Sequence, residues 1–309
     1  MIEADGLVKS FGFRKTIRAI DHVSFSAKKG TRLGFLGTKG SGKTTLLRIL
    51  STTLRPDEGT LRLGDLDGIR KPAAARRHLG YMPEGMDLSG WGTGKQYLRF
   101  WGMVSGIAGG ARNAAIERVV EYLEVGDHVT EDLTELTVEM LRRITLAQAL
   151  LTDPEVLILD EPMTGLSGFE RGFIGGKLEE LAKEGKTIVL SSHLLEDIRA
   201  SSDRVAIMSE GRLTEVLGIG DLLRKIGEGK DARIFVDSDP LPSKAIQSLK
   251  GLKGVVDVRS AATATVVYVR PGEVGPDSIR DVLASQGIEV RGIREAKLKL
   301  GDVFSSIHP

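Results

Sequence analysis

"TRLGFLGTKGSGKTTLLRILSTTL", residues 31–54, contains an apolar run, a glycine-rich loop and a second run whose apolar residues have helical spacing. Within it, Gly37 to Thr44 matches the pattern GxxxxGK[ST]. A loop of this kind between a strand and a helix wraps its backbone N–H groups around phosphate, and the helix N-terminus adds partial positive charge. The segment therefore predicts a nucleotide-binding loop, in which Lys43 reaches the β- and γ-phosphates and the Thr44 hydroxyl binds Mg²⁺.

Nucleotide contacts are expected along the whole of this loop. The alternative is an ordinary glycine turn, but an apolar strand before the loop and a helix after it favour the phosphate-binding interpretation. Lys39 adds a positive charge inside the loop, which favours a polyanionic ligand. The predicted nucleotide-binding residues are Gly37, Thr38, Lys39, Gly40, Ser41, Gly42, Lys43, Thr44 and Thr45.

A pair of acids ends the continuous apolar run "EVLILDEP", residues 155–162. Such a run is typical of a strand buried on both faces of a parallel sheet. Asp160 at its carboxyl end suits an indirect Mg²⁺ ligand, and Glu161 suits a general base that polarises the attacking water. Acids at strand ends are often merely solvated, so this assignment depends on the phosphate loop that accompanies it.

A histidine ends another apolar run, "TIVLSSHLLEDI", residues 187–198. A single histidine is usually structural. The position of His193 after a buried strand, one strand beyond Glu161, favours a contact with the γ-phosphate instead.

Composition excludes several other kinds of chemistry. The chain has 309 residues, no cysteine and a formal net charge of +1, so thiolate metal sites, disulfides and cysteine nucleophiles are excluded. A nucleic-acid partner is not expected, because a sequence-independent grip on nucleic acid needs a concentrated basic face. No apolar run is long enough to span a bilayer, and the N-terminus has no apolar signal core, so any membrane association is expected to go through a partner.

With the phosphate loop, the acidic strand end and the histidine in this order, the chain resembles the ATP-binding cassette (ABC) ATPases over about residues 1–218. The resemblance implies an α/β fold: a P-loop NTPase domain of ABC type, with a RecA-like core, a β-subdomain and a helical subdomain. It implies ATP and Mg²⁺ as cofactors and Lys43, Glu161 and His193 as catalytic residues. Phe11 in "KSFG" falls where the family places an aromatic that stacks on adenine. Glu84 in "YMPEGM" falls where the family has a glutamine that touches Mg²⁺ and water.

The implied metal ligands are therefore Thr44, Asp160 and Glu84, the last of which is a departure from the family pattern. A more serious departure lies in the signature segment, usually LSGGQ, which here is Leu136-Thr137-Val138-Glu139-Met140. In the family this segment brings bare backbone N–H groups to the nucleotide of a second subunit. Val138 adds a branched side chain there, and Glu139 adds a carboxylate near a polyanion.

Glu139 also has a simpler interpretation, since an acid in the first turn of a helix is locally favourable. Ser167 in "TGLSG" stands where the family usually has an aspartate in a loop that crosses between subunits. The motifs with which this chain would bind its own ATP are thus intact. The segments that would contact the ATP of a second subunit are altered. Both features are explained if the chain pairs with a different ATPase subunit that has an intact signature segment. If the chain instead forms a homodimer, weak ATPase activity is expected.

Three regions are expected along the chain. Residues 1–218 form the ATP-binding domain, with a helical subdomain at about 84–151. Residues 219–230 are glycine-spaced and charged, which predicts a linker. Residues 231–309 follow a strand–helix–strand–strand–helix–strand pattern, which predicts a small α+β domain of unassigned role.

The expected function is the ATP-binding and ATP-hydrolysing subunit of a transporter, of the exporter type by resemblance. It would work with an integral membrane subunit and a second ATPase subunit, on the cytoplasmic face of the membrane. Trp91 and Trp101 either line the contact with the membrane subunit or pack in the core. The alternatives are a soluble ABC ATPase without a transport role and a regulatory ATP-binding subunit with weak hydrolysis.

Overall fold

The computed structural model describes residues 1–309 apart from 13–15, 86–87, 228–231, 261–264, 271–272 and 296–309. The chain divides into two compact units, Met1–Ile219 and Gly220–Pro309. No helix among the described residues is both long enough and apolar enough to cross a membrane.

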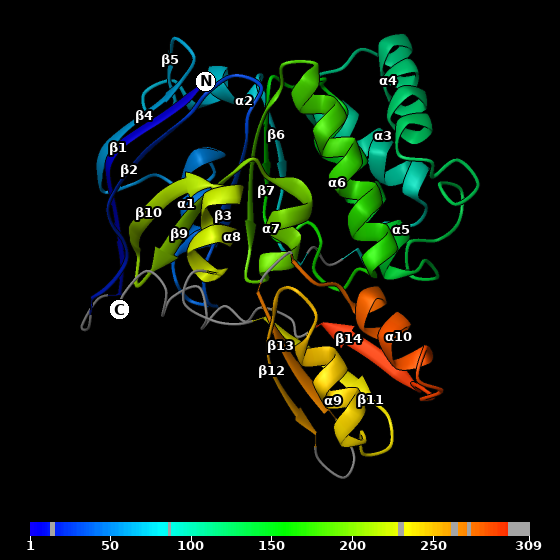
Figure 1. The fold of residues 1–309 in the computed structure, drawn as a ribbon. Helices are drawn as coiled ribbons and strands as arrows, with labels where there is room; N and C mark the ends of the chain where they lie inside the picture. The colour runs from blue at the N-terminus through cyan, green and yellow to red at the C-terminus, as the bar shows by residue number, and fades with distance from the viewer. Residues whose placement is uncertain (13–15, 86–87, 228–231, 261–264, 271–272, 296–309) are drawn as a thin grey trace. The chain divides into compact units, whose positions relative to one another are not determined.

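A six-stranded sheet forms the centre of the first unit, with the strand order β10-β9-β3-β8-β7-β6 (Figure 1). Its strands are β3 (Arg32–Leu36), β6 (Leu79–Met82), β7 (Val156–Leu159), β8 (Thr187–Ser192), β9 (Arg204–Ser209) and β10 (Arg212–Gly218). The strands from β9 to β6 pair in parallel, and β10 adds an antiparallel edge. Every residue of β7 and β8 is buried, as the continuous apolar runs in the sequence predict.

An antiparallel sheet with the order β2-β1-β4-β5 forms a second layer. Its strands are β1 (Ile2–Phe11), β2 (Ile17–Ala27), β4 (Glu58–Leu63) and β5 (Leu66–Asp67). Strands β1 and β2 are 10 and 11 residues long, and register shifts interrupt their pairing.

Helices fill the space between and around these sheets. Helix α1 (Lys43–Leu50) packs between the two sheets, since its leucines share one core with β1, β3 and β7. Helices α6 (Gly168–Lys183) and α7 (Leu195–Ser201) contact β3 and β8 of the six-stranded sheet. A short helix, α2 (Pro72–Arg76), precedes β6.

Three helices lie together beside β6: α3 (Gly94–Val104), α4 (Gly109–Tyr122) and α5 (Val138–Leu150). Apolar residues at helical spacing bury one face of each, for example Tyr97 and Leu98 of α3. Thr93 and Gln96 form a reciprocal capping box that starts α3. These helices occupy the region for which the sequence predicts a helical subdomain.

The second unit contains an antiparallel sheet with the order β12-β13-β11-β14. Its elements are β11 (Ala232–Asp237), α9 (Ser243–Lys250), β12 (Val255–Ser260), β13 (Thr265–Val269), α10 (Pro276–Ala284) and β14 (Gly292–Glu295). One apolar core joins the sheet to the two helices, through Ile234, Leu249, Val267 and Leu283.

Within the segment predicted as a linker, residues Ile219–Gly227 form helix α8. Ile219, Leu222 and Leu223 have the spacing of one helical face, and Leu222 is fully buried. The glycines at positions 220 and 227 lie near the ends of this helix, where they interrupt it least.

Candidate nucleotide site

Four neighbouring strands of the six-stranded sheet, β3, β8, β7 and β6, end at the same edge. Each is followed by residues for which the sequence predicts a role in nucleotide binding. The phosphate loop follows β3, His193 follows β8, Asp160 and Glu161 follow β7, and Glu84 follows β6. Because parallel strands point the same way, their carboxyl ends meet at one edge, which is where ligands bind in open α/β sheets. The tertiary structure thus gathers residues that are up to 156 positions apart (37 to 193).

The conformation of the phosphate loop depends on two of its glycines. At Gly37 a side-chain Cβ would lie 2.5 Å from both the Met208 carbonyl oxygen and Ser41 Oγ. Gly42 is the N-cap of α1, with a φ of 102°, and a Cβ there would lie 2.4 Å from the Ala19 carbonyl oxygen. Any L-residue at either place would clash, and Gly42 also has a backbone conformation that favours glycine.

Lys43 is buried and its ammonium lies inside the loop. Nζ donates to the Gly37 carbonyl oxygen at 2.8 Å and to that of Thr38 at 3.1 Å. It lies 4.0 Å from Oε1 of Glu161. Burial lowers the pKa of Lys43, whereas the charges of Glu161 and, more weakly, Asp160 raise it. The lysine is thus held in place by carbonyl oxygens, which a phosphate oxygen can replace as its partners.

Thr44, Glu84 and Asp160 converge on one point. Thr44 Oγ1 lies 3.4 Å from Oε2 of Glu84 and 3.3 Å from Oδ1 of Asp160. These are long hydrogen bonds, and all the atoms involved are oxygens. Mg²⁺ prefers such a donor set, with one or two carboxylates completed by phosphates and water.

Asp160 has an unused ligand atom in this group. Ser191 Oγ donates to its Oδ1 at 2.6 Å, whereas its Oδ2 is buried and has no hydrogen-bond partner among the residues that the structure describes. Burial raises the pKa of Asp160, and hydrogen bonds from Ser191 and Thr44 act in the opposite direction. A buried carboxylate oxygen without a partner is costly, so the residues present fit a bound cation.

Glu161 has an uncommon backbone conformation, and one oxygen of its carboxylate has two close polar neighbours. Its φ is 50°, a left-handed conformation that is uncommon for a residue other than glycine. Its N–H donates to Ser191 Oγ at 2.9 Å, which helps to hold that conformation. Its Oε2 accepts from Thr164 Oγ1 at 2.7 Å and lies 2.9 Å from His193 Nδ1. Strain of this kind is concentrated at functional sites.

The described contacts bring together Lys43, Thr44, Glu84, Asp160, Glu161 and His193. Phe11 is not part of this network. It ends β1 opposite Ile17, is 45% exposed, and has the Lys9 ammonium 5.7 Å from its ring centre. Thr38, Lys39 and Gly40 form the exposed tip of the loop, and Ser41 is buried. Thr45 lies in the first turn of α1, where it is half-buried.

Two polar residues of the site cannot be identified from the sequence motif. Ser191 links Asp160 to the backbone of Glu161, and Thr164 binds the Glu161 carboxylate. The signal for Ser191 is two serines at the end of a buried apolar strand, because a hydroxyl there must find a hydrogen-bond partner.

The altered signature segment starts helix α5. Thr137 is its N-cap and accepts from the Met140 N–H at 3.4 Å. Val138 is 50% exposed, and its Cγ1 would lie 3.4 Å from a Cβ placed on Gly165. Glu139 is half-buried in the first turn. The segment is therefore a well-capped helix start. Its first turn also carries side chains at the positions where glycines would leave the backbone bare.

The fold and this site define a P-loop ATPase. The family described as ABC transporter matches residues 20–164. Nod factor export ATP-binding protein I of Paraburkholderia xenovorans is 36% identical over 211 residues, which are 68% of each chain. Linearmycin resistance ATP-binding protein LnrL of Bacillus subtilis is 30% identical over 227 residues, 74% of this chain and 72% of that protein.

Solved structures agree with this fold. A dimeric bacterial ABC transporter cassette superposes with a TM-score of 0.66 at 21% identity, over 71% of this chain and 99% of its own. A dimeric cassette bound to ADP and Pi after hydrolysis superposes with a TM-score of 0.65. The chain belongs to the ABC transporter family, as one of its ATP-binding, ATP-hydrolysing proteins.

Proposed function

We propose that this chain is the ATPase subunit of an exporter whose membrane-spanning part is a separate chain. The observation that carries this is the cluster of Lys43, Thr44, Glu84, Asp160, Glu161 and His193 at the edge of β3, β8, β7 and β6, in a chain whose relatives are named for export and drug resistance. We place the subunit on the cytoplasmic face of the membrane, where ATP is available.

Within the site we assign roles by geometry. Lys43 and the N–H groups of residues 37–45 hold the phosphates, and Thr44, Glu84 and Asp160 hold Mg²⁺, which would neutralise phosphate charge when bound. Glu161 accepts the proton of the attacking water, and His193 keeps the Glu161 carboxylate oriented toward it. We assign the adenine contact to Phe11, whose exposed ring leaves a face open for stacking.

The start of α5 supports a second, different ATPase subunit as partner. In an ATP-bound pair of cassettes, this segment would face the nucleotide of the other subunit. Val138 projects from it and Glu139 adds a negative charge. Two like charges at about 4 Å repel by about 4 kcal/mol at an effective dielectric near 20. A partner with a glycine-containing segment would complete the site on Lys43 and Glu161, whereas two copies of this chain would leave both sites impaired.

The face of α3 supports the membrane-subunit contact. Trp91 packs edge-on to Tyr97 with ring centres 5.3 Å apart, and stacks on Trp101 at 6.3 Å. The two tryptophans thus pack with each other, while Phe100 and Met103 of the same helix are 40% and 53% exposed. We assign the contact to these exposed side chains, because an apolar surface of this kind marks an interaction site.

The proposal is tested by replacing the general base. In the chain paired with its ATPase partner, E161Q should lower ATP turnover about 10²- to 10⁴-fold while ATP binding is retained. K43A should instead weaken ATP binding, because the phosphates lose their cation. Unchanged turnover in E161Q would contradict the assigned base.

A regulatory ATP-binding subunit is the second candidate, and Val138 and Glu139 are the observation that favours it. The ATP turnover of E161Q distinguishes a hydrolysing subunit from a regulatory one. Normal ATP binding with turnover that is unaffected by E161Q, in every pairing tested, would support regulation.

A further inference from the structure

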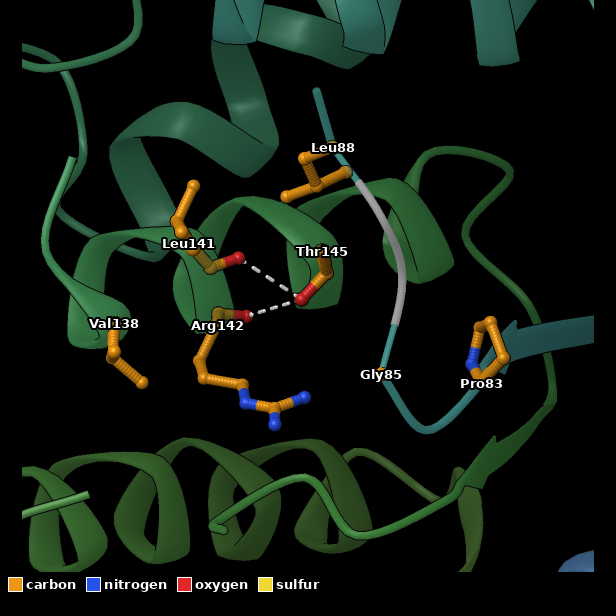
Figure 2. Close-up of a pocket in the computed structure, with 7 residues that line it drawn as sticks. All are labelled: Pro83, Gly85, Leu88, Val138, Leu141, Arg142 and Thr145. Carbon is orange, nitrogen blue, oxygen red and sulfur yellow. Dashed lines mark hydrogen bonds between the residues drawn. The ribbon is translucent and has the colours of Figure 1, made fainter. Parts of the chain in front are cut away.

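Two adjacent arginines at the start of α5 have opposite surroundings. Arg143 is buried and forms two hydrogen bonds with the Glu170 carboxylate, at 2.8 and 3.1 Å. Arg142 points the other way. Figure 2 shows its side chain extending from α5 into the space between that helix and the loop that carries Pro83 and Gly85.

That space is a cavity of about 130 Å³ lined by Pro83, Gly85, Leu88, Val138, Leu141, Arg142 and Thr145. The other lining side chains that the structure describes are not acidic, and Thr145 Oγ1 donates to the Leu141 and Arg142 carbonyl oxygens at 3.0 Å. Among the described residues, the Arg142 guanidinium has no hydrogen bond or ion pair. Half-burial of a cation that lacks such a partner is unusual, because burial of a charge is costly.

The carboxylates that act on Arg142 are those of the nucleotide site. Burial lowers the pKa of Arg142, while the charges of Glu84 and, after it, Glu161 raise it. Glu84 belongs to the loop that forms the cavity wall, one residue before Gly85. Its carboxylate is exposed and is bound by Thr44 at 3.4 Å, at the long end of the range for a hydrogen bond.

Glu84 also adds a negative charge to the nucleotide site. It lies with Asp160 and Glu161, so three carboxylates gather around the Thr44 hydroxyl and the Lys43 ammonium. A glutamine at position 84 would need no counter-charge. A glutamate in this setting is repelled by its acidic neighbours and gains from a nearby cation.

We propose that Arg142 is a positioning residue that pairs with Glu84 across the cavity and so holds its carboxylate toward the Thr44 and Asp160 oxygens. The inference rests on the proposed function, since it assumes that these three residues hold Mg²⁺. Arg142 touches neither nucleotide nor metal in this account. It sets the position of a ligand that is otherwise held by one long hydrogen bond.

A double-mutant cycle on the full chain tests this pairing. The affinity of a fluorescent ATP analogue is titrated with and without Mg²⁺ for the unmodified chain, R142Q, E84Q, R142Q/E84Q and R142K. We expect R142Q to weaken the Mg²⁺-dependent affinity about ten-fold relative to the unmodified chain. In the E84Q background the same change should weaken the affinity by less than about two-fold. R142K should retain most of the affinity, since it keeps the charge. Affinity without Mg²⁺ should not change.

R70Q is the matched control, because the Arg70 side chain is 87% exposed and its ion-pair partner is Asp67, which is not a residue of the site; it should match the unmodified chain. Equal losses from R142Q in both backgrounds would overturn the proposal, as would a loss of affinity without Mg²⁺. The proposal would also be overturned if the affinity losses of R142Q and E84Q are additive and R142Q unfolds at a lower temperature in the absence of nucleotide. Arg142 would then stabilise the fold and not position Glu84. If the unmodified chain shows no Mg²⁺-dependent nucleotide binding, the proposed function itself fails, and that result is distinguishable from an additive cycle.

Discussion

His193 Nδ1 lies 2.9 Å from Oε2 of Glu161, so the end of β8 is joined to the end of β7 through the two side chains assigned to catalysis. Thr164 Oγ1 donates to the same oxygen at 2.7 Å. The histidine and threonine therefore leave Oε1, which faces Lys43 at 4.0 Å, as the carboxylate oxygen without a short hydrogen bond. The geometry makes His193 a hydrogen-bond partner of Glu161.

The first prediction concerns this pairing. H193A should lower the turnover number for ATP by about 10- to 100-fold, the range typical when a hydrogen-bonded partner of a functional group is removed. The KM for ATP should change less, because Lys43 and the loop hold the phosphates. Steady-state ATPase kinetics measure both constants. A change in KM alone would mean that His193 contributes to binding and not to the orientation of Glu161.

The second prediction concerns the first turn of α5. In a preparation of this chain alone, V138G/E139G should raise ATP turnover about ten-fold, equivalent to about 1.4 kcal/mol of activation free energy. Two glycines should also destabilise the helix by about 1 kcal/mol each, visible as a lower unfolding temperature. V138A/E139A is the control, because it removes the same side chains and keeps good helix formers. Turnover that stays unchanged in both variants would mean that this turn does not face nucleotide.

The third prediction concerns the buried ion pair of Arg143 and Glu170, which ties α5 to α6. The Arg143 guanidinium also lies 3.7 Å from the Phe173 ring centre and donates to the Leu123 carbonyl oxygen at 3.3 Å. E170A leaves this cation buried without its partner, so it should lower the free energy of unfolding of the first unit by about 3–5 kcal/mol. Chemical denaturation measures the change.

Replacing both partners should cost much less than the sum of the two single changes, so R143M/E170L is the companion variant. The exposed pair Lys183–Glu179 serves as a comparison, because both side chains are largely in solvent and E179A should have little measurable effect. Similar losses in E170A and E179A would contradict the importance of burial.

The fourth prediction concerns Asp257 in the second unit. Side-chain hydrogen bonds from Lys250 and Arg259, and one from the Val258 N–H, lower its pKa to about 2. A lowered pKa means that the folded state favours the charged form. The stabilisation is present above the ordinary value near 3.9 and is lost as the pH falls from there toward about 2. A carboxyl NMR titration should find the lowered pKa, and K250M should raise it. An ordinary pKa in the unmodified chain would refute the pairing.

The sequence by itself determined the parts of this protein that depend on local pattern. The loop at 37–44 is recognisable because a turn with this geometry needs glycine at Gly37 and Gly42, and those constraints lie within eight residues. The buried strands β7 and β8 follow from uninterrupted apolar runs, and α5 follows from its spacing and its Thr137 cap. The residues of the site could be proposed because they stand at the ends of such strands.

Only the tertiary structure decided which of these residues meet. The sheet order β3-β8-β7-β6 is not the order of the chain, and it is this order that sets Ser191 between Asp160 and Glu161. Local periodicity carries no information about strand order, because that order depends on contacts between distant segments. The surroundings of Arg142 were hidden for the same reason, since its cavity and its lack of an ion pair among the described residues depend on segments distant in sequence.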